Sequence, residues 1–515
     1  MTNTPANEYV QSIIKGFEID SDLLKKLTSK YIESMDNGLS HSSGGKSHLP
    51  MIPTFITKLP NGTEKTDILA CDLGGTSFRC LYIKLKGNSK FTTEMKKWEI
   101  PSDYLAEEGA DLPENAFFDY LANKIVSFVQ YHNSNDENKD LLSTKKNFNL
   151  GFTFSYPVEQ TALNAGNLIR WTKGFEIKSV VGKDIVELLQ KSIDNKLNSV
   201  DPEKYPFTIS CVALCNDTTG TLLSGAYTST YDSQDIVDPI MSIICGTGFN
   251  IAYMEDLASC TKLTEEQVST IKTKDVTEMC INTESGSFDN ELSVLPVTQY
   301  DKIVDEESTN PGYHLFEKRI SGMFLGEILR LVIVDLIQKE FLLEPKPSKK
   351  QYTHKFSLKT EVLSHIEIDD SKDLKQTELY LIESLGLRTT TEQRHYLQQI
   401  TRAISRRSAY LVSVAISAII IKSGRLDPKS SKYKYHQELE VCCDGSVVQY
   451  YPGYKSMIRH GLSLGSLGHE GERRVHISMA LDGSGLGAGL AALTASKWWY
   501  ILYMYLKPKT MKFYD

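Results

Sequence analysis

Two apolar segments that lie about 170 residues apart in this chain end in the same kind of turn. Residues 71–76 are CDLGGT, and residues 244–248 are ICGTG. Glycines in such a turn let backbone N–H groups approach a polyphosphate, and a threonine hydroxyl adds a donor. The repeat predicts two related lobes, each offering a phosphate-facing hairpin. Taken singly, each turn is equally compatible with a tight β-hairpin that binds nothing.

A third glycine segment, residues 482–489 (DGSGLGAG), follows an apolar strand and opens an Ala/Leu-rich helix. A glycine turn at a helix N-terminus is suited to an anion or a nucleotide. It is not a dinucleotide-binding fingerprint, because no βαβ unit precedes it and no suitably placed acidic residue follows. Residues 45–47 (GKS) resemble the end of a P-loop, but Ser40 stands where that motif needs glycine, so a flexible linker is favoured.

The order of the apolar segments predicts an α/β fold. A chain of 515 residues is too long for one ordinary core and suits two packed lobes. Strands that alternate with helices indicate a sheet covered by helices. We expect strands within 66–83 on both sides of the glycine turn and at 149–154, 207–214, 239–245, 439–444 and 475–481, and helices from Asp20 or Ser21, at 113–131, 315–339 and 393–422, and after Gly483.

Charge and cysteine usage exclude several classes of protein. A net charge of -8 argues against a nucleic-acid scaffold, which needs a basic face. The apolar stretch 486–506 is interrupted by Lys497, and its densest part, 498–506, is shorter than the ~20 residues of a membrane span. We expect a packed helix followed by an aromatic tail. The nine cysteines form no CxxC pair, and the polar N-terminus has no signal peptide, so a cytoplasmic protein is expected.

Three further segments have a more specific pattern. Residues 151–157 (GFTFSYP), 170–175 (RWTKGF) and 214–221 (LCNDTTGT) resemble the sugar-site signature of the hexokinase family, in its order and approximate spacing. Residues 287–291 and 310–319 most resemble the fungal glucokinase branch. The resemblance extends from about residue 17 to residue 493, nearly the whole chain.

The resemblance implies an actin-like ATPase (ribonuclease H-like) fold, with two lobes around a central cleft. By this comparison, residues 1–66 are a helical segment that packs on the large lobe, and 67–215 are the small lobe. Residues 216–482 are the large lobe, and 483–515 are a C-terminal helix returning to the small lobe, with the aromatic tail.

The implied reaction is ATP-dependent phosphorylation of a hexose, most of all D-glucose, at its 6-hydroxyl, the first step of glycolysis. The hydroxyl needs an acceptor for its proton, and Asp217 matches the family's catalytic base. Lys173 is the second catalytic candidate, able to donate to the sugar and to balance the carboxylates. The resemblance assigns sugar contacts to Ser155, Thr172, Lys173, Asn216, Asp217, Asn250, Glu284 and Glu317.

The partners on the other side of the cleft are ATP and Mg²⁺. Asp72 is placed to orient Mg²⁺ through its water shell, because a hard cation prefers carboxylate oxygen. The glycine turns and the resemblance together give the nucleotide-binding candidates Asp72, Gly74, Gly75, Thr76, Ser77, Arg79, Lys97, Gly246, Thr247, Gly248, Ser446, Gly483, Ser484 and Gly485.

Four residues close to this chemistry depart from the family pattern. Ser77 replaces an Asn, Ile251 replaces a Gly or Ala, and Ser285 replaces an aromatic residue, while Phe249 occupies a smaller, variable position. The shorter side chain of Ser77 is expected to weaken a phosphate contact. The loss of an aromatic residue and the added bulk at the other positions are expected to reshape the sugar pocket. They leave open a diverged sugar-binding regulatory protein with weak kinase activity, or another hexose or amino-sugar acceptor. The sugar motifs disfavour a chaperone-type or filament-forming ATPase. No nucleic-acid or membrane partner is expected, and the chain is expected to be a monomer or a homodimer.

Overall fold

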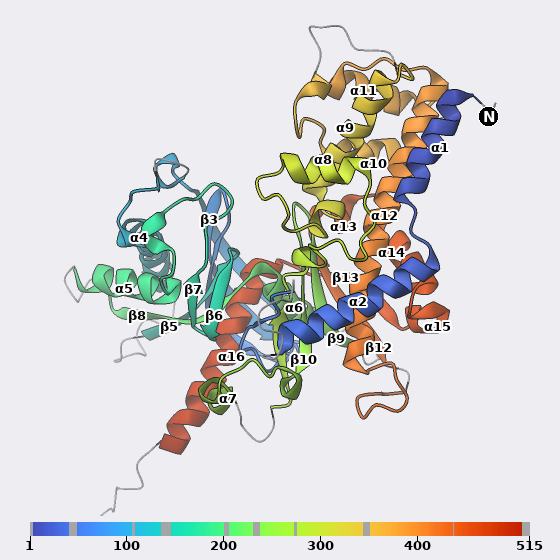
Figure 1. The fold of residues 1–515 in the computed structure, drawn as a ribbon. Coiled ribbons are helices and arrows are strands. Elements are labelled where there is room, and N and C mark those ends of the chain that lie inside the picture. Colours follow the sequence, from blue (N-terminus) through green and yellow to red (C-terminus); the bar gives the residue numbers. More distant parts are fainter. Residues whose placement is uncertain are drawn as a thin grey trace, which may run out of the picture.

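The computed structural model describes residues 4–40, 49–105, 109–134, 146–199, 205–229, 237–271, 276–342, 351–435 and 437–506. Figure 1 shows two bodies, each built around its own sheet. The lobe drawn at the left holds a five-stranded sheet of β2 (Lys65–Leu73), β3 (Ser77–Gly87), β4 (Lys90–Glu99), β5 (Lys146–Phe154) and β8 (Phe207–Cys215). Its order is β4-β3-β2-β5-β8; β3 is antiparallel to β2 and β4, and the β2–β5 and β5–β8 pairs are parallel.

The other lobe holds a six-stranded sheet of β1 (Ile52–Pro53), β9 (Val237–Cys245), β10 (Phe249–Asp256), β11 (Glu278–Asn282), β12 (Glu438–Asp444) and β13 (Val475–Met479). Its order is β1-β11-β10-β9-β12-β13. The part β11-β10-β9-β12-β13 repeats the order and strand directions of the first sheet. The repeat predicted from the glycine turns is therefore confirmed: one turn joins β2 to β3, and the other joins β9 to β10.

Helices cover both faces of the five-stranded sheet. The core on one face is formed with α4 (Glu114–Ser134) and α5 (Ile185–Asn198). The opposite face packs on α16 (Gly483–Leu506), which in turn packs on α6 (Asp217–Ser229), and α6 lies on β9 and β10 of the second sheet. The two helices thus lie between the two sheets. A small ribbon of β6 (Val158–Ala162) and β7 (Ala165–Leu168) lies beside β8.

The second lobe is organised around its longest helix, α12 (Thr391–Ser423), on which α1 and α2 pack (Figure 1). Among the described residues, α12 alone is long and apolar enough to cross a membrane, but its most apolar stretch is 89% buried, as in the core helix of a globular protein. The other helices are α1 (Pro5–Phe17), α2 (Ser21–Leu39), α7 (Glu265–Ile271), α8 (Gln299–Glu307), α9 (Gly322–Gln338), α10 (Thr360–Ile368), α11 (Lys375–Leu385), α13 (Ser446–Tyr450), α14 (Tyr454–Leu464) and α15 (Gly468–Glu472).

The expected elements are present, most of them with limits shifted by a few residues, and three of the differences change the interpretation of a segment. The helix expected at 315–339 begins only at Gly322, because Glu317–Arg319 form a separate 3₁₀ turn. The strand expected to reach residue 481 ends at Met479. Residues 498–506, expected in an aromatic tail, belong to the backbone of α16. The possible P-loop residues 45–47 and the rest of the tail, 507–515, lie outside the described residues.

Glycines bring α16 into backbone contact with its neighbours. A Cβ on Gly487 would overlap the Cα and the carbonyl oxygen of Gly220 in α6. A Cβ on Gly151 in β5 would overlap the carbonyl of Ala488. Because no side chain separates these backbones, the first turns of α6 and α16 lie side by side. The glycine segment at the start of α16 was predicted to bind phosphate, whereas Gly487 of that segment packs against Gly220 of α6.

We therefore expect Gly487→Ala to lower the free energy of unfolding by about 1–3 kcal/mol or more, since two rigid backbones must separate. Gly489→Ala is the matched control in the same helix. Its Cβ would meet the side chain of Ile68 at 2.7 Å, and a side chain can move. Alanine also favours a helix by about 1 kcal/mol over glycine. Urea unfolding measures the free energy of unfolding of both variants. Equal losses in the two variants would contradict the role of the backbone contact between α6 and α16.

Candidate active site

Asp217 begins helix α6, two residues after β8 ends. The helix starts here because the side-chain oxygen Oδ1 of Asn216 accepts the N–H of Thr219 at 2.9 Å, as a helix cap does. The hydroxyl of Thr218 donates to Oδ1 of Asp217 at 3.1 Å. Both Asn216 and Asp217 are partly exposed. The end of the strand and the start of the helix therefore present an amide and a carboxylate together.

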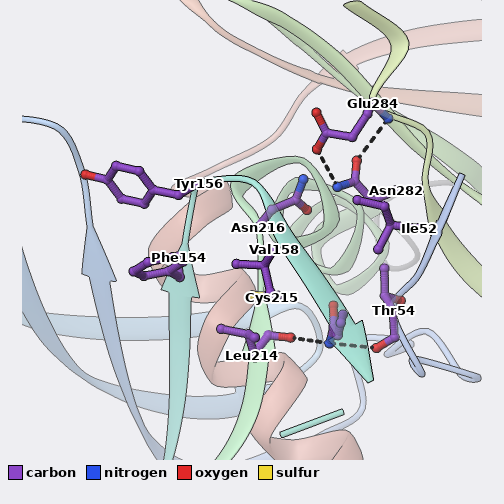
Figure 2. Close-up of a pocket in the computed structure, with 11 residues that line it drawn as sticks. Ile52, Thr54, Phe154, Tyr156, Val158, Leu214, Cys215, Asn216, Asn282 and Glu284 are labelled. Atoms are coloured by element: carbon purple, nitrogen blue, oxygen red, sulfur yellow. Dashed lines mark hydrogen bonds between the residues drawn. The ribbon is translucent and has the colours of Figure 1, made fainter. Parts of the chain in front are cut away.

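A chain of amides holds Glu284 opposite this helix start. Nδ2 of Asn250 donates to Oδ1 of Asn282 at 2.8 Å. Nδ2 of Asn282 in turn donates to Oε1 of Glu284 at 2.8 Å (Figure 2). Glu284 has a positive φ of 53°. The sequence analysis identified Asn250 and Glu284 but missed Asn282. A polar residue at the end of the apolar strand β11, two positions before Glu284, was the available signal.

Figure 2 shows a cavity between the two sheets into which these residues face. Its empty volume is ≈ 350 Å³, open in part to solvent. Asn216 and Glu284, both predicted sugar contacts, contribute to its lining with Asn282. The remainder comes from Ile52, Thr54, Phe154, Tyr156, Val158, Gln160, Leu214 and Cys215. Two of the predicted sugar contacts, Asn216 and Glu284, thus lie at one hollow that is partly open to solvent.

Glu317 connects this hollow to the second glycine turn. Its Oε2 accepts the backbone N–H of Phe249 at 2.8 Å, and its Oε1 lies 3.5 Å from Nδ1 of His314. A Cβ on Gly248 would lie 2.8 Å from the same Oε2. Glycine at position 248 is therefore needed for the carboxylate to approach the turn. His314 was not predicted as a site residue.

Burial raises the pKa of the Glu284 carboxyl. The hydrogen bond from Asn282 and the proximity of His314 act in the opposite direction, while the nearby carboxylates of Asp217 and Glu317 raise the pKa further. Asp217 and Glu317 therefore both lie close enough to Glu284 to raise its pKa, so the three predicted acidic residues share one electrostatic environment. A ring of hydrogen-bond acceptors at this place suits a molecule that offers several hydroxyl donors.

The loop that follows β7 covers the first glycine turn. Lys173 has a positive φ of 56°, and its Nζ lies 5.2 Å from the centroid of the Tyr156 ring. A Cβ on Gly75 would lie 2.9 Å from Cβ of Lys173. The hydroxyl of Tyr156 donates to the carbonyl of Gly74 at 2.9 Å. Two segments that were assigned separately, one to the sugar and one to phosphate, are therefore in contact. Ser155 and Thr172 are partly exposed neighbours of Tyr156 and Lys173.

Arg79 organises the phosphate side. Its Nε donates to Oδ2 of Asp72 at 2.8 Å, its Nη1 lies 3.2 Å from Asp482, and its Nη2 donates to the hydroxyl of Ser484. Ser484 also donates to Oδ2 of Asp72 at 3.1 Å. Burial raises the pKa of Asp72, and Arg79 opposes that rise. The guanidinium of Arg79 on β3 thus contacts both the end of β2 and the start of α16. Asp482 was not among the predicted site residues.

The other nucleotide-side candidates fall into accessible and buried groups. Gly74, Gly75, Thr76, Ser77, Thr247 and Gly248 are at least partly exposed, and Lys97 is exposed on β4 opposite Arg79. Gly483 and Gly485 are buried against Thr221 and Leu81, so packing alone requires small residues there. Contacts of these residues with a nucleotide stay a prediction.

Gly246 and Ser446 meet behind the second turn. A Cβ on Gly246 would lie 3.3 Å from the backbone nitrogen of Ser446, and Gly445 has a positive φ of 112°. Burial raises the pKa of the preceding Asp444, and the carboxylates of Asp217 and Asp482 raise it further. Asp444 is therefore a further acidic residue of the cleft, which was not among the predicted site residues.

Three of the four departures from the family pattern lie behind the site. Ile251 is fully buried, and Phe249 is buried against Phe316 at a ring distance of 5.7 Å. The hydroxyl of Ser285 is hydrogen-bonded to Tyr31 of α2 at 2.6 Å and to Thr283 at 2.5 Å. None of these three side chains lines the cavity, so any effect on its shape would be indirect, and the reshaped pocket stays a prediction. Ser77 lies at the first turn, where its carbonyl accepts the N–H of Gly74.

Comparison with known proteins gives a consistent result. The hexokinase family is matched by two models, over residues 9–227 and 240–494. Glucokinase-1 of Saccharomyces cerevisiae is 47% identical over 500 residues, covering 94% of this chain and 97% of that protein. Glucokinase-1 of Kluyveromyces lactis is 44% identical, covering 96% and 100%. The structure of a hexokinase from Schistosoma mansoni complexed with glucose is 30% identical, with a TM-score of 0.73 over 96% of this chain and 100% of that chain. The predicted two-lobed actin-like fold is thereby confirmed.

The raised pKa of Glu284 gives a prediction about stability. A carboxyl whose folded pKa exceeds its unfolded value stabilises the fold at low pH, and this contribution is lost as the pH rises through the folded pKa. Glu284→Gln removes the buried charge and can still accept from Asn282. We expect the ligand-free variant to melt at a higher temperature than the wild type at pH 7, with the difference vanishing near pH 4. Thermal unfolding between pH 4 and pH 8 measures this, and a variant that is less stable at pH 7 would contradict it.

Proposed function

Because this chain belongs to the hexokinase family, we propose that it transfers the γ-phosphoryl group of ATP to the 6-hydroxyl of a hexose, with D-glucose as the preferred acceptor. The products are hexose 6-phosphate and ADP. The observation that supports this most strongly is that Glu284 lies close enough to Asp217 and Glu317 for their carboxylates to raise its pKa, beside a glycine turn that Glu317 contacts directly.

In this proposal Asp217 accepts the proton of the attacking hydroxyl. The residue lies at the start of α6, facing the part of the cleft that also holds Glu284 and Asp444. Glu284, Glu317 and the amides of Asn216 and Asn250 orient the sugar through its other hydroxyls. Holding the reacting oxygen in line with the phosphoryl group is the main contribution that a protein makes to such a transfer.

The nucleotide is proposed to lie across both glycine turns. The two turns offer backbone N–H groups, and Arg79 and Lys173 add positive charge near the first turn. The residues suit a hydrated Mg²⁺ held mainly by the nucleotide, because no group of three or more metal-binding side chains occurs within the described ranges. Asp72 and Asp444 would hold its water shell, and the ion would supply charge neutralisation of the phosphates. Arg79 and Ser484 both donate to Oδ2 of Asp72, which leaves Oδ1 for that water shell.

The remaining parts of the proposal concern organisation and location. We place the small lobe at 67–215 and the large lobe at 216–482, with residues 1–66 belonging to the large lobe. This agrees with the packing of α1 and α2 on α12, and of α16 on β2 and β5.

A cytoplasmic location is supported by nine cysteines that are all free and buried.

A coupled assay of ADP release tests the function. We expect turnover that depends on the sugar, with glucose giving the highest kcat/KM among glucose, mannose, fructose, glucosamine and N-acetylglucosamine. ATP hydrolysis that does not depend on any sugar would contradict the proposal. Sugar binding without turnover would instead support a regulatory sugar-binding protein, for which the buried positions of Phe249, Ile251 and Ser285 give no reason.

Asp217→Asn tests the catalytic assignment, because the amide keeps the shape of the carboxylate but is a poor proton acceptor. We expect kcat to fall by about 10²–10⁴-fold, the usual contribution of general base catalysis, with little change in folding. Asp20→Asn is the matched control, since the exposed Asp20 caps α2 by accepting the N–H of Leu23 at 2.8 Å, and asparagine caps a helix equally well. Activity of the Asp217 variant close to that of the control would exclude Asp217 as the base.

A further inference from the structure

The β6–β7 ribbon contains a side chain that reaches both sheets. Nε2 of Gln160 lies 3.2 Å from the carbonyl oxygen of Thr54, 3.1 Å from that of Leu214 and 3.2 Å from that of Ala162. Leu214 belongs to β8 of the five-stranded sheet, and Ala162 belongs to the ribbon itself. An amide nitrogen has two hydrogens, so the three carbonyls share them.

The carbonyls of Leu214 and Thr54 lie outside the ribbon, and each belongs to a segment that supports one side of the sugar site. Leu214 is three residues before Asp217, and its N–H is held by the ribbon as well, donating to the carbonyl of Leu163 at 2.7 Å. Thr54 directly follows β1 of the six-stranded sheet, and its N–H donates to the carbonyl of Cys280 at 3.2 Å. Cys280 lies in β11, the strand that leads to Asn282 and Glu284. Gln160 therefore bonds to the segment that supports the proposed base and to the segment that supports the sugar-binding carboxylate.

The position of Gln160 in the cavity makes this link relevant to the sugar. Its side chain contributes to the lining together with Asn216, Asn282 and Glu284. The ribbon has a second connection to the large lobe, since Nε2 of Gln267 in α7 donates to the carbonyl of Thr161 at 3.3 Å. That connection is on the surface, whereas the bonds of Gln160 are partly buried beneath the site.

We propose that Gln160 is a positioning residue that sets the separation of the Asp217 and Glu284 sides of the sugar site, by bonding the two lobes to the β6–β7 ribbon. It does not take part in the chemistry. Its loss lets the two sides separate, so that sugar hydroxyls can no longer engage both carboxylates at once. The nucleotide turns are held by other contacts and keep their geometry. This inference rests on the proposed function.

The test compares Gln160→Met with Gln190→Met. Gln190 is a matched control because its Nε2 donates to the carbonyl of Ile209 at 3.0 Å and its Oε1 accepts the N–H of Cys211 at 2.8 Å, all within the small lobe. For Gln160→Met we expect KM for glucose to rise by about tenfold, the effect of losing one or two net hydrogen bonds, with KM for ATP within about twofold of wild type. Gln190→Met is expected to lower the melting temperature and to leave both KM values unchanged.

Two further measurements keep the test decisive. Gln160→Asn retains an amide that is one methylene shorter, so it is expected to raise KM for glucose even if the methionine variant does not fold. Glucose binding is also followed by tryptophan fluorescence, since Trp171 lies next to Thr172, and the dissociation constant should rise in parallel with KM.

The failure of this proposal differs from the failure of the proposed function. Wild-type protein without sugar-dependent ADP release would refute the function itself. An active wild type, with glucose binding and KM for glucose unchanged in both Gln160 variants, would overturn the positioning role alone. A uniform change of kcat and both KM values, as expected of a general folding defect, would overturn it as well.

Discussion

The contact between α6 and α16 is the constraint on which the rest of this structure depends. The two helices belong to different lobes, since α6 packs on β9 and β10, and α16 packs on β2, β5 and β8. Glycines at positions 220 and 487 let their backbones touch, which brings the first turns of both helices to the same place. Asp217 begins one helix and Ser484 lies in the first turn of the other. A bulkier contact would separate the proposed base from the Arg79 cluster on the phosphate side.

Local sequence was sufficient for features that depend on local chemistry. The two glycine turns, the capped start of α2 at Asp20 and the strands on both sides of Gly74 were predictable, because turn formation and capping involve residues close in sequence. Asn282, His314, Asp444 and Asp482 were missed as site residues. Each is placed by pairing or packing between segments far apart in the chain, and an isolated polar residue gives no signal of such a neighbour.

The departures from the family pattern also show that local sequence does not reveal which residues are neighbours in space. Counting substitutions near a motif suggested an altered pocket, because sequence distance was taken as spatial distance. In a strand, neighbouring side chains point to opposite faces. Asn250 therefore faces the cleft while Phe249 and Ile251 are buried in the core, and Ser285 turns towards Tyr31 of α2. Three changes thus adapt the support of the site to this chain's own core.

The site concentrates negative charge that the fold itself does not need. Burial raises the pKa of Asp72, Glu284 and Asp444, and carboxylates near the cleft reinforce one another. Such an arrangement destabilises the ligand-free protein at neutral pH, since each charged form is disfavoured by desolvation. A sugar that donates hydroxyl hydrogens, and a cation-bound nucleotide, would offset this cost on binding. The carboxylates that prepare the cleft for its ligands are therefore a cost to the stability of the ligand-free fold, and not a source of it.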